Sequence, residues 1–242
     1  DTAVPKTTAV TFILGGHRLV TVRYDEPRPF TIVGHKLARN CPPGISGEAV
    51  LLELLDAVID RSADILERIG MEVDQVSHEI IEPDGKTESQ ALSYKEILKA
   101  IGRKGDLTSK VRESLVSIGR LLLFLANEAE GMRWSKDVRL QLQAMQRDVL
   151  SLSDHATYLS SKITFLLDAM LGVVQIEQNN IIKIFSIASV AMMPPTLIAS
   201  IYGMNFKAMP ELGWQLGYPF AILLMVIAAI VPFLYFRWKK WL

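Results

Sequence analysis

The stretch YGMNF at residues 202–206 decides the fold, because it lies between two runs without a charged residue. These runs cover residues 184–206 and 212–236. Each is long enough to cross a bilayer, which takes about 20 apolar residues per helix. We therefore expect two membrane-spanning helices joined by a short outer loop. The polar residues of YGMNF would lie at the membrane edge, which indicates that they have a specific function.

The remaining composition indicates a membrane anchor on a water-soluble body. The 242 residues are 50% hydrophobic and 21% charged, with a formal net charge of zero. Nearly all charged residues precede residue 184, and that part of the chain is long enough to bury a core. The single cysteine, Cys41, argues against disulfide cross-links and suits a reducing compartment.

Charged flanks predict the orientation of the spans. The loop between them carries only Lys207 and Glu211, whereas a basic and aromatic cluster follows the second span: Arg237, Trp238, Lys239, Lys240 and Trp241. Because basic residues stay on the cytoplasmic side of a membrane, both termini are expected in the cytoplasm and the loop outside.

Residues 1–45 are expected to be the remainder of an N-terminal α/β domain in the cytoplasm. Two β-rich runs, 9–15 and 18–24, predict a hairpin, and the pattern then breaks at residues 25–30. Two strands do not make a stable sheet alone. We therefore expect strands from sequence that precedes Asp1 to complete the sheet.

Residues 46–134 show the apolar spacing of cytoplasmic helices. The first helix should run to about Ile81, where Glu, Pro, Asp and Gly follow one another. A second helical stretch covers about 88–128, with a break or kink expected at Gly102 and Gly105.

Residues 135–203 predict one very long stalk helix that continues into the membrane over about 184–203. No helix breaker lies between Ser135 and Pro194, so the helix should be roughly 100 Å long at about 1.5 Å per residue. Apolar residues alternate in steps of four and three from Val138 to Val173, as in a coiled coil. This seam packs on other subunits or on the two preceding helices, and one long helix can carry both contacts. The outer loop then covers 204–216, the second span 217–236 and a basic cytoplasmic tail 237–242.

A largely polar or small stripe follows one side of the first span. Its members are Asn179, Ile182, Ser186, Ser189, Met193, Thr196, Ser200 and Gly203. Polar groups in hydrocarbon prefer protein or water, so the stripe is expected to face an axis. Two other interpretations stay open: hydroxyls that bond their own helix backbone, and small residues that pack against another helix. Pro194 and Pro195 suit a helix that bends around an axis, although such kinks also occur in inert spans.

Five features in fixed order resemble the CorA family of divalent-cation channels. They are NNIIK at 179–183, the Pro194 region, YGMNF at 202–206 with MPEL at 209–212, GYP at 217–219, and the basic, aromatic C-terminus. The resemblance covers roughly residues 135–242. It implies an α+β cytoplasmic domain, a funnel-shaped homopentamer in the inner membrane, a pore lined by the first span of each subunit, and a second span outside it.

The resemblance also implies a function: Mg²⁺ influx, with Co²⁺ and Ni²⁺ as further ions, driven by the membrane potential and gated by intracellular Mg²⁺. The expected partners are identical subunits, the bilayer and divalent cations, with no nucleic acid. We expect no enzyme, since the four histidines lack ligand spacing and no phosphate loop is present. Two alternatives are a zinc-transporting member of the superfamily, which the middle residue of the GMN triplet disfavours, and a membrane-anchored coiled-coil scaffold.

The candidate site residues fall into three groups. The selectivity group at the outer mouth is Gly203, Met204 and Asn205, with Glu211 as a carboxylate that concentrates cations. The pore-lining group is Asn179, Ile182, Phe185, Ser186, Ser189, Met193, Thr196 and Ser200, of which Ile182, Phe185 and Met193 are candidate apolar gates. By its distance from the GMN triplet, the resemblance implies that Asp168 is a regulatory Mg²⁺ ligand. Its partner carboxylate is not identified, and a solvated Asp168 without a ligand is the alternative.

Overall fold

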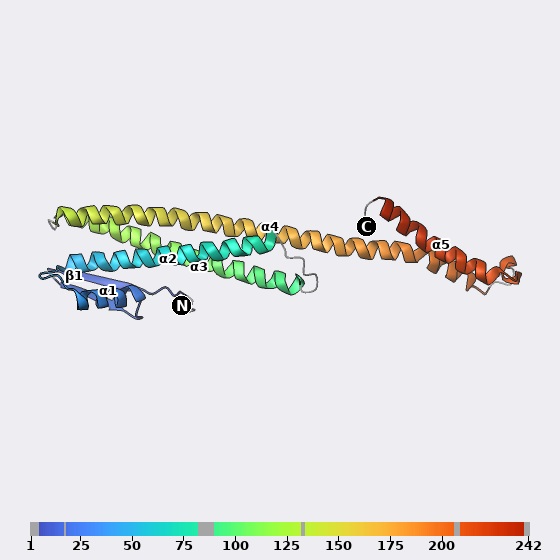
Figure 1. The fold of residues 1–242 in the computed structure, drawn as a ribbon, viewed down its shortest axis with the longest axis horizontal. Coiled ribbons are helices and arrows are strands. Elements are labelled where there is room, and N and C mark those ends of the chain that lie inside the picture. Colours follow the sequence, from blue (N-terminus) through green and yellow to red (C-terminus); the bar gives the residue numbers. More distant parts are fainter. Residues whose placement is uncertain (1–4, 17, 82–89, 132–133, 206–208, 240–242) are drawn as a thin grey trace. The chain divides into compact units, whose positions relative to one another are not determined.

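The computed structural model describes residues 5–16, 18–81, 90–131, 134–205 and 209–239. The chain forms two compact units, residues 1–170 and 171–242. Along the chain the elements are β1 (Val10–Gly15), β2 (Arg18–Arg23), α1 (Arg28–Arg39), α2 (Gly47–Ile81), α3 (Gln90–Gly131), α4 (Lys136–Tyr202), the 3-10 turn η1 (Pro210–Gly213) and α5 (Gly217–Trp238) (Figure 1). The small sheet, the long helix and the apolar C-terminal helix expected from the sequence are all present.

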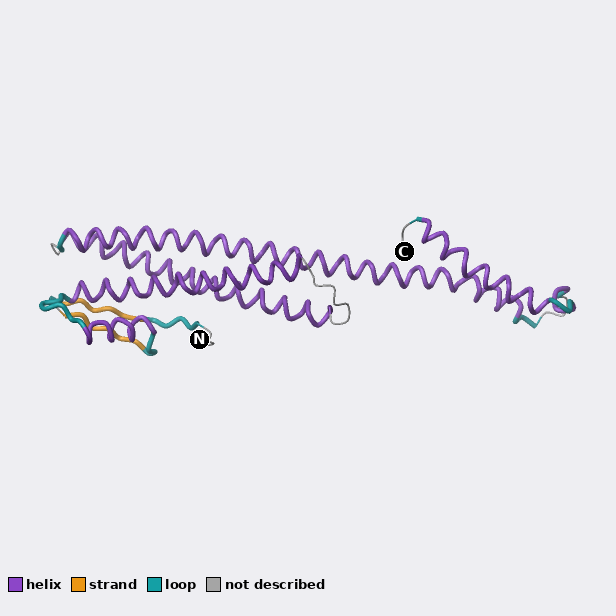
Figure 2. Tube along the Cα trace, viewed as in Figure 1, coloured by secondary structure: helices purple, strands orange, loops and turns teal. Residues whose placement is uncertain are grey.

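The hairpin β1–β2 lies beside α1 and α2 (Figure 2). Its strands pair antiparallel, and alternate side chains point towards the helices. Phe30 and Val33 of α1 form a buried core with Leu54 of α2, and Phe12 of β1 packs against it. The rings of Phe12 and Phe30 stack with centroids 6.2 Å apart. One face of the hairpin is therefore fixed by apolar packing.

Helix α1 was not expected, because residues 25–30 were interpreted as a break. The helix begins at Arg28, directly after Pro27, and Pro29 lies in its first turn. Proline suits this position, since its fixed φ is helical and the first turn leaves backbone N–H groups unpaired in any case. The carbonyl of Pro27 accepts a hydrogen bond from the amide of Phe30 at 3.0 Å. Here proline starts a helix instead of preventing one.

The coiled-coil seam of α4 packs inside the chain, against α2 and α3. Its buried members are Leu142, Met145, Val149, Ala156, Leu159, Ile163, Leu166 and Met170. A Cβ added to Gly70 of α2 would lie 3.8 Å from Leu159, and one added to Gly105 of α3 would lie 3.6 Å from Ile163. The packing on the two preceding helices thus accounts for the seam, and any contact between subunits must use another face of α4.

The predicted break at Gly102 and Gly105 is wrong, since α3 is one helix from Gln90 to Gly131. A glycine costs a helix about 1 kcal/mol relative to alanine. The surrounding packing outweighs that cost, because Ile101 and Thr108 on the same helix are 4% and 0% exposed. A Cβ on Gly105 would be in ordinary van der Waals contact with Ile163 of α4, so an alanine would also fit there.

Ion pairs connect the three helices of the bundle. Lys104 of α3 pairs with Glu72 of α2, and Lys162 of α4 pairs with Asp74 of α2. The hydrogen bond to Asp74 raises the pKa of Lys162. Burial and the nearby charge of Arg68 lower the pKa of Lys104. The two ion pairs connect α2 to α3 and to α4.

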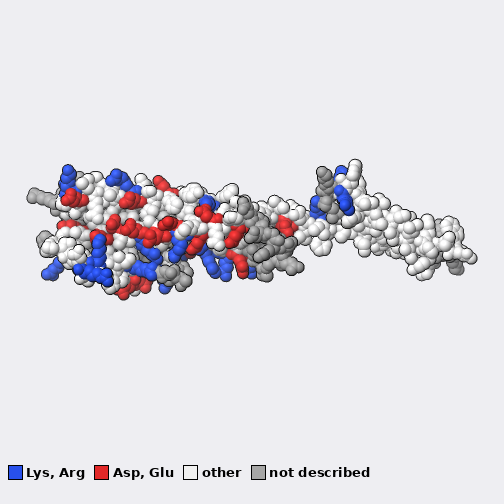
Figure 3. Space-filling view, in the orientation of Figure 1, with Lys and Arg blue, Asp and Glu red and all other residues white. Residues whose placement is uncertain are grey.

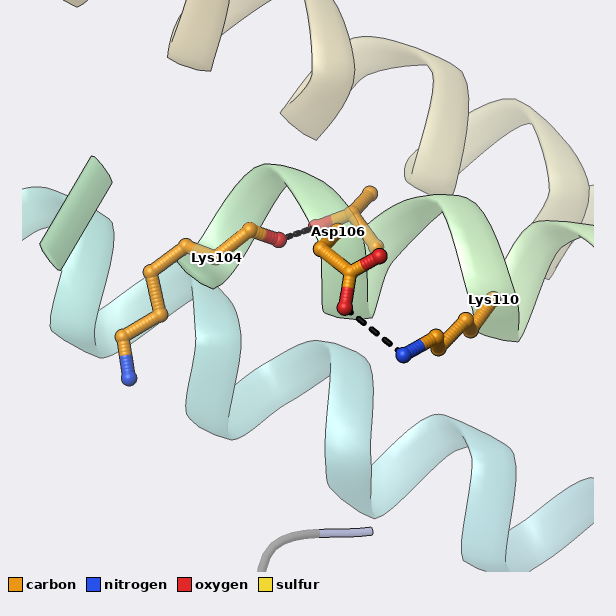
Figure 4. A network of polar contacts seen from close by, with 4 residues as sticks. Lys104, Asp106 and Lys110 are labelled. Carbon is orange, nitrogen blue, oxygen red and sulfur yellow. Dashed lines mark hydrogen bonds and ion pairs between the residues drawn. The ribbon is translucent and has the colours of Figure 1, made fainter. Parts of the chain in front are cut away.

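A local polar network on α3 accompanies the Lys104 contact (Figure 4). The hydroxyl of Thr108, which is fully buried, donates a hydrogen bond to the carbonyl of Lys104 at 2.7 Å. One helical turn apart on the exposed side, Lys110 and Asp106 form an ion pair at 2.7 Å. The buried hydroxyl of Thr108 therefore has its hydrogen-bond acceptor within its own helix and needs no polar partner from the helices packed around it.

Candidate pore-lining face and outer mouth

The C-terminal half of α4 packs against α5 along one side only. Ile187 of α4 and Ala221 of α5 are 6% and 8% exposed, although both belong to apolar helices with few covered positions. Half-buried residues continue the contact on both helices: Lys183, Ala191, Pro194, Ile198 and Tyr202 on α4, and Gly217, Met225, Ala228, Pro232 and Phe236 on α5. Ala191, Gly217 and Ala228 are the small residues among these positions, and the others are larger side chains.

The polar stripe of α4 lies on a different side from the α5 contact. All of its predicted members are exposed in the single chain: Asn179, Ile182, Ser186, Ser189, Met193, Thr196, Ser200 and Gly203. The aliphatic residues Val190, Leu197 and Ile201 form a third, also exposed side. Helix packing within the chain therefore does not explain the stripe. In Figure 3 the visible face of α5 and of the α4 segment beside it shows no charged side chain except a basic cluster at the end of α5.

Hydroxyl groups of the stripe donate to their own helix backbone. Ser186 donates to the carbonyl of Ile182 at 2.8 Å, Ser189 to that of Phe185 at 2.9 Å, and Thr196 to that of Met192 at 2.8 Å. A hydroxyl has one proton and two lone pairs, so each oxygen still accepts hydrogen bonds. The exposed stripe thus presents acceptors in preference to donors.

Apolar members of the stripe are large and exposed. Ile182 is 53% exposed, and Phe185 and Met193 are each 69% exposed. In lipid such side chains are unremarkable, but on a water-facing side they are costly to hydrate. Ile182, Phe185 and Met193 are thus the large apolar side chains on the exposed stripe side of α4.

The GMN triplet lies at the C-terminal end of α4. The amide of Gly203 donates to the carbonyl of Ala199 at 2.9 Å, and that of Met204 donates to Ile201 at 3.2 Å. A Cβ at residue 203 would lie only 3.1 Å from the Ala199 oxygen, which explains a glycine there. Asn205 is exposed just beyond this last turn. Glu211 lies in η1, and its side chain is outside the described residues.

Asp168 lies on the exposed side of α4, opposite the buried seam. Thr157, Ser161 and Thr164 share its side of the helix at steps of four and three residues, and each donates its hydroxyl proton to the carbonyl four residues earlier, at 2.9 to 3.1 Å. We did not anticipate these three hydroxyls, although their spacing to Asp168 was readable from the sequence. Among the described residues no group of three or more His, Cys, Asp or Glu side chains could hold a metal ion, so the partner of Asp168 is not identified.

Other carboxylates of the unit formed by residues 1–170 gather around Asp56 of α2. Burial raises the pKa of Asp56, and the neighbouring charges of Asp60, Glu53 and Asp148 raise it further. Lys36 of α1 offsets part of this repulsion through its pair with Glu53. The cluster is thus a partly compensated acidic surface between α2 and α4.

Comparison with known proteins identifies close relatives in sequence. The family described as "CorA-like Mg2+ transporter protein" matches residues 1–240. The magnesium transport protein CorA of Escherichia coli K12 is 39% identical over 235 residues, which cover 96% of this chain and 71% of that protein. CorA of Haemophilus ducreyi is 37% identical over 233 residues, with the same coverage of 96% and 71%.

Solved structures share the fold at low sequence identity. The CorA magnesium transporter of Methanocaldococcus jannaschii matches with a TM-score of 0.73 at 17% identity, over 96% of this chain and 77% of that one. The full-length CmaX protein matches with a TM-score of 0.60 at 14% identity, over 97% and 68% of the two chains. With these matches, two apolar helices long enough to cross a membrane and a GMN triplet after the first, the chain belongs to the CorA family of Mg²⁺ transporters.

Proposed function

We propose that this protein is a homopentameric channel that conducts hydrated Mg²⁺, and also Co²⁺ and Ni²⁺, into the cell. The observation that carries the proposal is the exposed polar side of α4, which α5 leaves uncovered. A polar surface at membrane depth is stable only against protein or a water-filled cavity. A ring of α4 helices around an axis satisfies this condition, with α5 of each subunit outside the ring.

Conduction of hydrated Mg²⁺ fits the chemistry of this side of α4. Mg²⁺ dehydrates reluctantly, and the water molecules around it point their protons outward. A suitable pore therefore offers hydrogen-bond acceptors, and the oxygens of Ser186, Ser189 and Thr196 are acceptors because their own protons bond the backbone. The membrane potential drives the ion inward with about 4.6 kcal/mol per 100 mV for two charges.

At the outer mouth we assign selection of the ion to Asn205, together with the carbonyl of Gly203. Neutral amide oxygens attract the hydrated ion without replacing its water shell. Glu211 and Met204 complete this end of the pore, Glu211 as a charge that raises the local cation concentration. Ile182, Phe185 and Met193 are apolar rings at which a narrow pore loses its water and closes.

Cysteine substitutions on neighbouring positions test the proposed pore. Cys41, the single cysteine, is exposed, so a Cys41→Ser background is free of thiols. In proteoliposomes, Ser189→Cys should react with a charged thiosulfonate reagent and lose Mg²⁺ uptake. Val190→Cys is the matched control, because it faces hydrocarbon and should neither react nor lose uptake. Equal reaction at both positions, or no ion flux at all, would favour the scaffold alternative.

A pentamer is the expected assembly, since a single α4 does not enclose a pore and symmetric rings close around an axis. Mass measurement of the detergent-solubilised protein should give five chains. The α4 seam is buried against helices of its own chain. Subunit contacts are therefore expected on the exposed side of α4 that carries Leu150 and Phe165. A conducting monomer or dimer would contradict this assembly.

Regulation by intracellular Mg²⁺ is assigned to Asp168. Carboxylates that approach one another at subunit interfaces repel, and bound Mg²⁺ neutralises them and favours the closed state. Asp168→Ala should therefore weaken inhibition as internal Mg²⁺ rises in an uptake assay, whereas Asp168→Lys should mimic the bound cation. Identical inhibition curves for wild type and Asp168→Ala would leave Asp168 as a solvated residue.

Zinc transport is the alternative within the superfamily. Competition of Zn²⁺, Co²⁺ and Ni²⁺ against Mg²⁺ in the same liposome assay decides between them. Strong transport of Zn²⁺ with weak transport of Mg²⁺ would overturn the assigned ion while leaving the pore in place.

A further inference from the structure

We propose that Lys183 of α4 and Arg237 and Lys239 of α5 form a binding site for the headgroup of an anionic phospholipid. Arg237 and Lys239 are exposed at the end of a helix that is otherwise apolar. In the part of the chain that the structure describes, neither forms an ion pair with a carboxylate, nor does Lys183. Three cations without an internal counter-charge thus lie at a membrane surface.

Lys183 belongs to the same end of the α4–α5 pair as the basic end of α5. It lies one helical turn before the buried Ile187, on the side of α4 that α5 covers, and it is half-buried. On α5, Phe236 lies one turn beyond Pro232 on the covered side. Since α5 runs back along α4, both turns lie at the ends remote from the outer loop. A cation between two spans at this depth is the usual setting of a lipid headgroup site.

Aromatic side chains fix the depth of this site in the bilayer. The ammonium group of Lys239 lies 5.9 Å from the centre of the Tyr235 ring, and the rings of Tyr235 and Trp238 are 6.5 Å apart. Trp238 is 79% exposed. Tyrosine and tryptophan favour the headgroup region of a membrane, so the three cations lie at the level of the lipid phosphates.

Charge complementarity favours a lipid over other occupants. A diacyl lipid supplies both the phosphate that the cations lack and the chains that cover the exposed apolar side of α5. The assignment to the inner leaflet rests on the proposed orientation of the spans, whereas the headgroup chemistry does not depend on ion transport. A neighbouring subunit whose carboxylates neutralise the cations is the competing occupant.

Native mass spectrometry of the purified full chain tests the site with defined lipids. Wild type should retain phosphatidylglycerol in preference to phosphatidylcholine. The preference is the ratio of retained phosphatidylglycerol to retained phosphatidylcholine. It should fall at least about tenfold in the combined variant Lys183→Gln, Arg237→Gln and Lys239→Gln, since one basic residue near an anionic surface contributes about fivefold. The matched control changes three exposed cations of α3, Lys95, Lys99 and Arg112, to glutamine and should keep the preference.

The outcomes separate lipid binding from the alternatives. An unchanged preference in the triple variant, or no preference in wild type, overturns the proposal. Dissociation of the oligomer with an unchanged preference also overturns it and assigns the cations to subunit contacts. Should the triple variant fail to fold, Lys239→Gln alone is the substitute and should lower the preference about fivefold. Because lipid retention is measured without ion flux, a failure of the transport proposal leaves this result interpretable.

Discussion

Asn205→Ala is expected to abolish Mg²⁺ uptake while leaving the oligomer intact. Asn205 follows the last turn of α4, where the chain has left the helix and the side chain is exposed. Each subunit then loses a hydrogen bond to the ion's water shell, worth about 1 kcal/mol, and the losses in a ring combine. Uptake should fall by more than about 100-fold, a change that corresponds to more than about 2.7 kcal/mol. A Mg²⁺-sensitive dye inside proteoliposomes measures it.

Gln215→Ala provides the control for that experiment. Gln215 is an exposed amide in the same outer loop, but it lies outside the stripe and the GMN triplet. Its loss should leave uptake near wild type. Uptake by Asn205→Ala that matched the Gln215→Ala control would remove Asn205 from ion selection.

Thr196→Lys is expected to block the pore by charge repulsion. Thr196 lies within the stripe, at membrane depth, and its hydroxyl is bonded to its own helix. A lysine ammonium about 6 Å from a divalent ion opposes it by about 5 kcal/mol at an effective dielectric constant of about 20. Uptake should therefore be lost, and the oligomer mass should show that assembly persists.

Thr196→Val distinguishes this repulsion from simple loss of the hydroxyl. Valine keeps the shape of threonine and removes one acceptor, so uptake should fall several-fold without being abolished. Leu197→Thr places a hydroxyl on the adjacent lipid-facing side and should have little effect, because the hydroxyl can bond its own backbone. Normal uptake by Thr196→Lys would show that this side of α4 does not face the ion.

Much of the helical architecture was predictable from the sequence, because long helices leave strong signals. The absence of breakers after Ser135 predicted α4, and the uncharged run from 212 to 236 predicted α5. Periodicity also located the α4 seam. It did not identify the partner, since side chains at steps of three and four fit a neighbouring helix of the same chain as well as one of another subunit. Burial against Gly70 and Gly105 decides for the same chain.

The incorrect predictions concern residues whose effect depends on position. Residues 25–30 were predicted to interrupt the strand pattern, and β2 does end at Arg23, but the helix α1 that starts there was not predicted. Proline in the first turn loses no hydrogen bond, so Pro27 and Pro29 are compatible with this helix. A break was predicted at Gly102 and Gly105, but α3 continues through both glycines, and Ile101 and Thr108 beside them are buried. A local sequence pattern shows neither where a proline lies within a helix nor which side chains pack around a glycine.

The sequence predicted which residues of the candidate site share one side of α4. It did not predict which of them are covered by α5 and which are exposed. Spacing grouped Ser186, Ser189 and Thr196, whereas only the structure shows that α5 covers Ile187 and leaves the hydroxyls exposed. The sequence also left open whether these hydroxyls bond their own backbone, and they do. Backbone bonding and a role in the pore are therefore compatible, because the oxygen lone pairs stay free.

The internal packing of the α4 seam has a consequence for biosynthesis. Helices α2 and α3 and the seam of α4 all precede the membrane spans in the chain, and their core is complete without a second subunit. The bundle can therefore fold while the ribosome is still translating the apolar helices. With both termini in the cytoplasm, as proposed, only the short loop between α4 and α5, with Lys207 and Glu211 as its charged residues, crosses the bilayer. Each chain can therefore reach the membrane with the core of its helical bundle already formed, and the proposed association of subunits becomes the last step.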